Sequence, residues 1–427
     1  MNAAQGHIDR DVTAARGRVL DLFAGIGGFS LAAHSVGFDT VAFCEIEPYP
    51  QSVLRRHFPG VPIFDDVKEL TADALADACK SGLQGHRGEH GLQAGCGEVG
   101  AARDGGDGGT LILTAGFPCQ DISYAGKGAG LDGARSGLFY EVARLISELR
   151  PDYVLLENVA ALLTRGIDAV LGTLASLGYD AVWACIPACA VCAPHRRDRV
   201  WILAVPQADD NEAKLRRMYE HVLSRLTPFD LEAGWPTATA SDAWGSDLDR
   251  NGMVGKHNLG LGTAARINGT WPTPRACECR DAPNRKGGRG MSTAMIETVQ
   301  AGGSLNPDWV DLLQGYPVGY TLPEGEPMRA MAGEWPVGHA EDEMWPTPRA
   351  GCPGSRKPGT GGRVIAEEVR KAQHWPAGLG APQHPWEPPR LTTEKQHRAA
   401  RLKALGNSIV PAVARLWFAA IQEEATA

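Results

Sequence analysis

The sequence predicts an α/β protein with a doubly wound, mostly parallel sheet, followed by a second, irregular region. Short apolar runs alternate with helical patterns between residues 18 and 205, as expected when helices connect parallel strands. Gly-rich or polar turns follow several of these runs, at the carboxyl ends of strands, where open α/β sheets bind ligands. Beyond residue 206 the periodicity is lost and Gly, Pro and Trp become frequent, which predicts a second domain.

Composition sets the broad class of the protein. A length of 427 residues suits two or three domains, and no apolar run approaches the ~18 residues of a membrane span. Ten cysteines at irregular spacing favour a reducing cytoplasm over a disulfide framework. A net charge of −8 does not favour a nucleic-acid partner, although local basic patches can still bind one. Residues 1–16 are expected to form a tail without a secretory signal.

The first apolar run, over 18–24, predicts a buried strand that leads into a Gly-rich turn at 25–28 and a helix over 29–36. A strand, a Gly-rich turn and a helix together are typical of a nucleotide cradle, because glycine lets the backbone approach a ligand and the helix start presents free N–H groups. Ser30 stands where the dinucleotide fingerprint has its third Gly or Ala. The turn therefore predicts a cofactor site without matching that fingerprint fully.

Acidic residues follow the next two predicted strands. The strand over 40–44 ends at Glu45, about 20 residues after the Gly-rich turn, where a carboxylate can accept hydrogen bonds from both ribose hydroxyls. A solvated surface glutamate is the alternative at this position. The short strand over 61–64 ends at Asp65 and Asp66, from which a carboxylate can reach an adenine amino group.

A thiol follows the central strand. The apolar run over 110–115 stops at Gly116, and Pro118 prevents further ladder pairing, so that Cys119 comes next on a stiff turn. A single cysteine is more often a small apolar filler, and a catalytic role needs a partner acid. That acid is Glu157, which follows the buried strand predicted over 153–156.

The remaining elements complete the sheet and its surroundings. The Gly-rich segment 79–109 is expected to be an exposed insertion, and 120–136 a loop that either closes over a substrate or is an ordinary surface loop. Further predicted elements are helices over 137–149, 166–177 and 411–423, strands over 180–186 and 200–205, and a short helical piece after 206.

The second region contains an internal repeat. Trp-Pro-Thr recurs at Trp235, Trp271 and Trp345, each time at the start of a unit with Gly, basic residues and a short helical tail. Basic side chains on Gly-rich loops beside Trp suit contact with phosphates and bases. Structural Trp-Pro turns are the alternative.

In this order, these stretches resemble the carbon-5 cytosine-specific DNA methyltransferase family, of the bacterial restriction-modification or phage type. The resemblance covers 18–205, 305–321 and 404–421. It implies S-adenosyl-L-methionine as cofactor. The cofactor-binding positions that it implies are Phe23, Ala24, Gly25, Ile26, Gly27, Gly28, Glu45, Ile46, Asp66, Val67, Pro118, Asn407 and Ser408.

The resemblance also implies a covalent mechanism on a flipped-out cytosine. Cys119 adds to carbon 6, Glu157 hydrogen-bonds the exocyclic amine and N3, and Arg197 orients either Glu157 or the base carbonyl. Arg199 completes the family's arginine pair. The side chains expected to contact DNA are Gln120, Ser123, Lys127, Arg135, Trp271 and Arg275.

The predicted domains follow from this resemblance. The catalytic, cofactor-binding domain is 17–205, the target-recognition region is 206–403, and 404–427 returns to the catalytic domain. The family usually has Gln where this chain has His195. In addition, a third repeat follows the closing motif at 315–317, so that either the recognition domain is extended or 322–403 is appended.

Three other functions compete with this prediction. A transfer-RNA cytosine methyltransferase would share the fold but have a shorter recognition region, and an inactive DNA-binding relative would lack Cys119 or Glu157. A nicotinamide-dependent dehydrogenase explains only the Gly-rich turn. Cys189 and Cys192 are spaced like half a zinc site, but no second tight pair follows at the usual distance, so no metal is expected.

The expected partner is double-stranded DNA, and the expected location is the cytoplasm of a bacterial cell. A monomer without membrane contact is the default. A cognate restriction endonuclease is compatible with the resemblance, as is a chain that protects a mobile genome.

Overall fold

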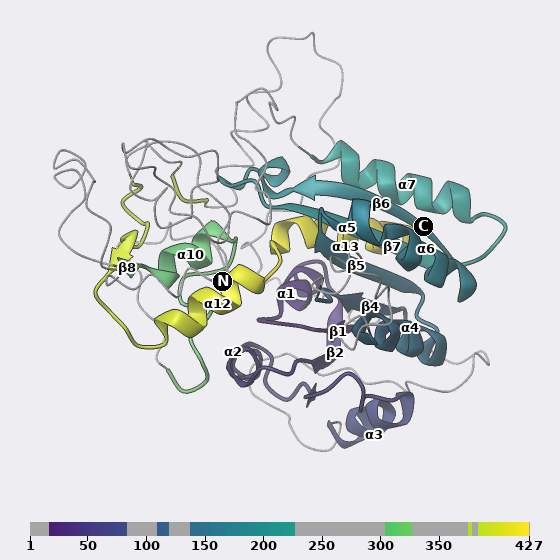
Figure 1. Ribbon diagram of the computed structural model, residues 1–427, viewed down its shortest axis with the longest axis horizontal. Coiled ribbons are helices and arrows are strands. Elements are labelled where there is room, and N and C mark those ends of the chain that lie inside the picture. The colour runs from purple at the N-terminus through teal and green to yellow at the C-terminus, as the bar shows by residue number, and fades with distance from the viewer. Residues whose placement is uncertain are drawn as a thin grey trace, which may run out of the picture.

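The computed structural model describes residues 17–82, 109–118, 137–226, 304–326, 375–377 and 383–426. They form a seven-stranded sheet covered by helices on both faces, with a smaller unit beside it (Figure 1). The strand order is β3-β2-β1-β4-β5-β7-β6. The strands are β1 (Arg18–Leu22), β2 (Asp39–Cys44), β3 (Ile63–Phe64), β4 (Leu111–Ala115), β5 (Tyr153–Val159), β6 (Tyr179–Pro187) and β7 (Asp198–Pro206).

The sheet is mostly parallel, as predicted. Strand β7 is the exception, because it pairs antiparallel with both β5 and β6. It returns directly from β6 through the short helix η2 (Ala188–Val191), and Pro187 stands opposite Asp198 in the register. No crossover helix separates β6 from β7, so the chain reverses as in a hairpin.

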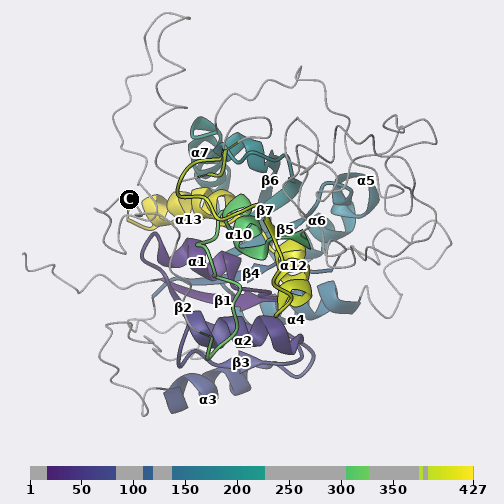
Figure 2. The same cartoon turned by 90° about the vertical axis from the view of Figure 1, so that its left-hand side faces the viewer.

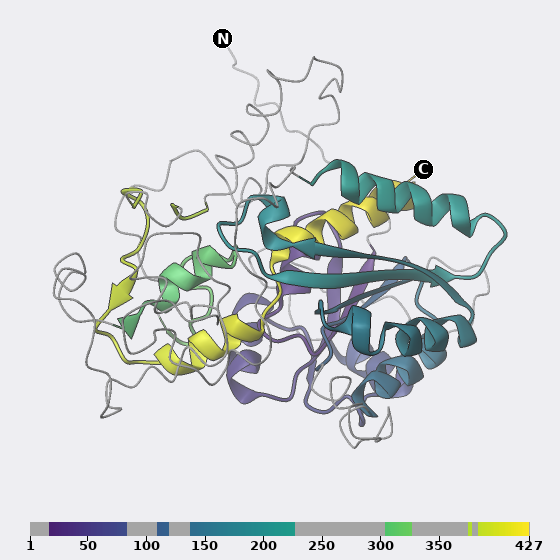
Figure 3. The same ribbon diagram turned by 45° about the horizontal axis from the view of Figure 1, so that its top comes forward.

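Helices bury both faces of the sheet. One face is covered by α1 (Gly28–His34), α7 (Asn211–Ser224) and α13 (Pro411–Thr426), which share a core that includes Phe29, Met218 and Trp417 (Figure 3). The other face is covered by α3 (Ala72–Gly82), α4 (Gly137–Leu149) and α6 (Ile167–Ser176). Because strands buried on both faces are mostly apolar, the nearly continuous apolar runs in the sequence located them.

Several element boundaries differ from the prediction; for example, β1 ends at Leu22 rather than at 24, and β7 begins at Asp198 rather than at 200. Strand β5 does not end at Leu156 but continues to Val159, because Glu157, Asn158 and Val159 pair with β7. Helix α3 extends to Gly82 and thus into the predicted insertion over 79–109; residues 83–108 lie outside the described residues. Helices α2 (Pro48–His57), α3 and α5 (Leu162–Arg165) were not predicted, nor were the two helices over 307–313 and 398–407.

The smaller unit combines segments that are far apart in the sequence. Helices α10 (Pro307–Leu313) and α12 (Arg398–Asn407) pack together, and α12 also touches α2 (Figure 2). Strands β8 (Ser304–Leu305) and β9 (Leu391–Thr392) pair antiparallel, and Asn306 donates to the Pro389 carbonyl at 2.7 Å. Residues 383–407 therefore pack with the closing motif, and the predicted boundary at 404 falls inside α12.

A membrane-span test gives a limited result for the described ranges. No single helix there is both long and apolar enough to cross a membrane, although α12 and α13, joined at a bend of 42°, pass together on length and composition alone.

Candidate active site

The Gly-rich turn after β1 has the geometry of a ligand cradle. Gly25 and Gly27 have φ of +55° and +80°, a backbone conformation that favours glycine. A Cβ atom at Gly25 would meet nothing within 4 Å, so the space beside this residue is open. A Cβ atom at Gly28 would lie 2.5 Å from the Tyr316 hydroxyl and 2.6 Å from Ile409 Cγ1. The turn is thus open on one side and tightly packed on the other.

Glu45 lies directly beside this turn. Its carboxylate accepts a hydrogen bond from the Gly25 N–H at 2.8 Å and another from the Glu47 N–H at 2.8 Å. Burial raises the pKa of Glu45, and these two backbone bonds oppose that effect. Each carboxylate oxygen keeps a further lone pair for a ligand. The neighbouring Ile46 is 68% exposed, which is unusual for an isoleucine and suits contact with a flat ligand group.

The other predicted cofactor positions surround the same strand edge. Asp66 follows β3, and its carboxylate accepts the Lys68 N–H at 3.0 Å, whereas Val67 is buried. Asn407 is the exposed last residue of α12, and the Ser408 hydroxyl donates to the Leu405 carbonyl at 2.9 Å. The structure therefore brings the carboxyl ends of β1, β2 and β3 and the end of α12 to the same edge of the sheet.

The turn after β4 is held from β5. Asn158 donates through its side-chain amide to the Phe117 carbonyl at 3.1 Å, and Phe117 packs against Phe139 with the ring centroids 5.1 Å apart. Pro118 is exposed and is the last described residue before Cys119. The Asn158 bond positions the backbone from which Cys119 follows.

Glu157 is the acid beside this turn. It is 8% exposed, and its Oε2 atom lies 3.5 Å from the position of a Cβ atom at Gly116. Arg199 forms an ion pair with it, with 2.8 Å between Nε and Oε1. Burial raises the pKa of Glu157, although the positive charges of Arg199 and Arg197 oppose the rise. The carboxyl group is thus closer to protonation at neutral pH than an exposed glutamate.

Arg197 has a different set of partners. Its backbone is left-handed, with φ of +37°, and its guanidinium donates to the carbonyls of Gly406 and Ser408. Burial lowers its pKa to about 9. The expected orientation of Glu157 by an arginine is therefore seen for Arg199, while Arg197 anchors the segment that links α12 to α13.

A family model matches the part of the chain that carries this candidate site. The model of the C-5 cytosine-specific DNA methylase family matches residues 17–81 and 109–241. The chain belongs to this family.

Two type II methyltransferases each match about half of the methylase chain. It is 33% identical over 195 residues to the type II methyltransferase M2.BsuMI of Bacillus subtilis, which covers 44% of this chain and 41% of the relative. It is 30% identical over 220 residues to the type II methyltransferase M.CviJI of Paramecium bursaria Chlorella virus IL3A, which covers 51% and 50%. The matches thus span about half the length of these relatives.

One solved structure covers more of the chain at lower similarity. It is a putative DNA modification methyltransferase encoded within a prophage of E. coli, with a TM-score of 0.46, 16% identity, and coverage of 96% of this chain and 99% of that one.

Several predicted site residues of the methylase lie outside the described residues. They are Cys119, Gln120, Ser123, Lys127, Arg135, Trp271 and Arg275, together with the three Trp-Pro-Thr repeats. Their roles stay predictions. Among the residues that the structure does describe, which include Cys185, Cys189 and Cys192, no three metal-binding side chains converge.

His195, the departure from the family's usual Gln, lies inside the protein. It is 1% exposed and sits beside the main chain of Leu313 in α10. Burial lowers its pKa to about 3, and the nearby Arg197 acts in the same direction. The imidazole is therefore neutral at physiological pH, as the amide of glutamine would be.

Two tyrosines of the smaller unit contact the Gly-rich turn. Tyr316 belongs to the closing motif at 315–317, but neither contact was predicted from the sequence. Tyr320 donates to the Ile26 carbonyl at 3.0 Å, and Tyr316 donates to the Ile409 carbonyl at 3.1 Å. Tyr320 also stacks on His57 with 3.9 Å between the ring centroids. Nothing in the local spacing predicts a contact between positions 294 residues apart.

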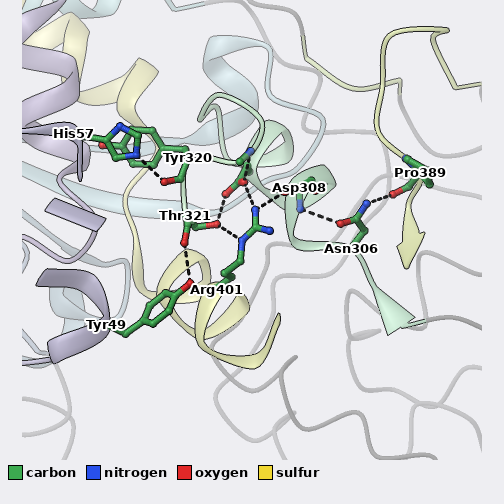
Figure 4. Close-up of polar contacts among 10 residues, drawn as sticks. Tyr49, His57, Asn306, Asp308, Tyr320, Thr321, Pro389 and Arg401 are labelled. Carbon is green, nitrogen blue, oxygen red and sulfur yellow. Dashed lines mark hydrogen bonds and ion pairs between the residues drawn. The ribbon is translucent and has the colours of Figure 1, made fainter. Parts of the chain in front are cut away.

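A buried ionic cluster holds these tyrosines in place (Figure 4). Arg401 of α12 pairs with Asp308 at 2.5 Å and with Asp311 at 2.7 Å, both on α10. It also donates to the Thr321 hydroxyl at 2.8 Å, and the Thr321 carbonyl accepts from Tyr49 of α2 at 2.9 Å. The cluster therefore joins α10, α12 and α2 directly beside Tyr320.

Proposed function

We propose that the chain transfers a methyl group from S-adenosyl-L-methionine to carbon 5 of a flipped-out cytosine in a specific duplex DNA sequence. The observation that carries this proposal is the buried Glu157, paired with Arg199 and adjacent to the turn that leads to Cys119. A carboxyl group with a raised pKa beside the turn that precedes Cys119 suits the addition of a thiol to a pyrimidine ring.

The residues around the Gly-rich turn fit the proposed cofactor. Open space lies beside Gly25, the Glu45 carboxylate has lone pairs free for ribose hydroxyls, and Ile46 offers an exposed apolar surface for adenine. When bound, the cofactor supplies its sulfonium methyl group as the electrophile. Asp66 is the proposed partner of the adenine amino group, and Asn407 and Ser408 are the proposed partners of the amino-acid end.

Cys119 and Glu157 perform the steps on the base. The Cys119 thiolate forms a bond to carbon 6, and the electrons of the 5,6 double bond move into the ring, making carbon 5 nucleophilic. Glu157 hydrogen-bonds the exocyclic amine and gives or shares a proton at N3 as negative charge develops there. After carbon 5 is methylated, its proton leaves to a base and the Cys119–carbon 6 bond breaks, which restores the ring.

Arg199 and Asn158 prepare these groups before the base arrives. Arg199 fixes the orientation of the Glu157 carboxylate through their 2.8 Å ion pair. Asn158 fixes the Phe117 carbonyl and hence the turn that carries the thiol. Such preorganisation lowers the reorganisation needed during the reaction.

Duplex DNA is the proposed substrate for two reasons. The chain keeps a long region between α7 and the closing motif, and its similar proteins M2.BsuMI and M.CviJI are type II methyltransferases. A base inside a duplex has to leave the stack to reach Glu157.

Bisulfite sequencing of a methylation-free bacterial host tests the proposal. Cells that express the intact chain should carry protected cytosines in one short sequence, and cells that express Cys119→Ala should carry none. Protection in neither strain would refute DNA methylation by this chain. Methyl incorporation into transfer RNA instead of DNA would favour the alternative substrate.

A further inference from the structure

A fully buried carboxyl group lies beneath the proposed active site, and the proposed mechanism does not use it. Asp21 of β1 is 0% exposed. One of its oxygens accepts the Ser30 hydroxyl at 2.9 Å, and the other accepts the Thr114 hydroxyl at 2.9 Å. Ser30 and Thr114 are also 0% exposed, so water does not reach this group of three side chains.

The three side chains come from three elements that build the site. Ser30 lies in the first turn of α1, directly after the Gly-rich turn. Thr114 lies in β4, opposite Asp21 in the parallel register of the two strands. The turn proposed to bind the cofactor (the cofactor turn, 23–28) begins two residues after Asp21. The turn that leads to Cys119 (the thiol turn, 116–118) begins two residues after Thr114. Asp21 and its partner Thr114 therefore each lie two residues before one of the two turns.

The contact between Ser30 and Asp21 explains why position 30 departs from the Gly-rich fingerprint. A Gly or Ala at position 30 would let α1 pack close to the strand and would keep only the backbone hydrogen bond of that residue to Asp21. Ser30 instead adds a hydroxyl that donates to Asp21. The serine at this position thus adds a hydrogen bond between α1 and Asp21 of the central strand β1.

Burial makes this arrangement costly for stability. It raises the pKa of Asp21 to about 7, against the opposing effect of both hydroxyl donors, and the carboxylate of Glu45 adds to the rise. The described partners of Asp21 are the hydroxyls of Ser30 and Thr114 and the Ser30 backbone N–H rather than a cation, and an apolar side chain would avoid the desolvation cost. A costly buried group in such a place suggests a role other than stability.

We infer that Asp21 is a positioning residue that anchors two turns, the cofactor turn through Ser30 and the thiol turn through Thr114. This inference rests on the proposed methyl transfer. Ser30 sets the position of the first turn of α1 and hence of the N–H groups that face the cofactor. Thr114 sets the end of β4 and hence the position of the turn at 116–118, which Cys119 follows in the sequence.

The hydrogen bond from Ser30 and the hydrogen bond from Thr114 predict two separate defects. Ser30→Ala should weaken binding of S-adenosylhomocysteine about fivefold to tenfold, and leave the rate of thiol attack at saturating cofactor unchanged. Thr114→Val should slow thiol attack by a similar factor and leave cofactor affinity unchanged. Asp21→Asn should show both defects. Thr173→Val in α6, which also removes a hydroxyl bond but lies on another helix, should show neither.

Two measurements on the full chain separate these outcomes. Calorimetry gives the dissociation constant of S-adenosylhomocysteine. The rate at which a covalent adduct is trapped on DNA that contains 5-fluorocytosine, at saturating S-adenosyl-L-methionine, reports thiol attack together with the methyl transfer that follows it. Thermal melting of each variant establishes that it is folded. A split of the two defects between Ser30→Ala and Thr114→Val supports the inference.

A purely structural role predicts a different pattern. Folded Ser30→Ala and Thr114→Val would then match the intact chain in both affinity and rate per active molecule, and this result would overturn the inference. Equal loss of both properties in each variant would overturn it as well. An intact chain that neither binds S-adenosylhomocysteine nor forms the adduct would instead refute the proposed function.

Discussion

Replacing Arg401 by methionine tests the ionic cluster that supports the cofactor turn. The substitution keeps an unbranched apolar stem but removes the contacts to Asp308 at 2.5 Å, Asp311 at 2.7 Å and Thr321 at 2.8 Å. Removing one partner of a buried ion pair typically costs about 3–5 kcal/mol. We expect a loss in that range, because Asp311 is 0% exposed and would keep its desolvation cost without the cation.

The loss should depend on pH in a defined direction. With Arg401 present, burial already raises the pKa of Asp311 to about 7, and removal of the cation should raise it further. A carboxyl group whose folded pKa is raised stabilises the folded state below its unfolded pKa, and this contribution is lost as the pH rises through the folded value. The free-energy loss caused by Arg401→Met should therefore be larger at pH 8 than at pH 6.

Lys403→Met is the matched control. Lys403 lies two residues further along α12 and forms an exposed ion pair with Glu47 at 2.7 Å. An exposed pair contributes about 0–1 kcal/mol, so this variant should lose little stability at either pH. Urea unfolding of both variants at the two pH values gives the comparison. Equal losses, or a loss in Arg401→Met that does not change with pH, would refute the reasoning.

Three further predictions concern the site itself. Glu157→Gln should lower kcat by about 10²–10⁴-fold while S-adenosylhomocysteine still binds; rapid methyl transfer by this variant would argue against an acid role. Tyr320→Phe removes the bond to the Ile26 carbonyl, worth about 1 kcal/mol, and should weaken cofactor affinity about fivefold by calorimetry, whereas unchanged affinity would dismiss the contact. Asp21, with its pKa raised to about 7 from the ordinary 3.8, should cost up to about 4 kcal/mol of stability as the pH rises from 4 to 8. Asp21→Asn should remove this decrease of the free energy of unfolding with pH, as measured by urea unfolding at several pH values. An unchanged decrease would contradict the prediction.

Much of the sheet could be predicted because its strands are buried on both faces. The strands β1 and β4, for example, are buried at every position, so their sequences do not alternate between apolar and polar residues. The direction of β7 could not be predicted, because an apolar run has the same appearance in either direction. The end of β5 was predicted too early, because Glu157 and Asn158 are polar residues typical of a turn, yet both pair with β7.

The candidate site was predictable where a motif is local in sequence. The Gly-rich turn and Glu45 are joined by the Gly25 N–H, as the spacing suggested. The two arginines were harder to separate. A regular strand would place Arg197 and Arg199 on the same face, but the left-handed backbone at Arg197 turns its side chain toward 406–408. The contact of Arg401 with Asp311 spans 90 positions and leaves no periodic signal.

Formation of a covalent complex with duplex DNA that contains 5-fluorocytosine tests the central claim most directly. Fluorine at carbon 5 cannot leave as a proton does, so the bond between Cys119 and carbon 6 persists once the methyl group has been transferred. We expect a protein–DNA band on a denaturing gel that requires S-adenosyl-L-methionine and is absent in Cys119→Ala. A band that persists in Cys119→Ala, or no band with the intact chain on any duplex that it binds, would contradict the account.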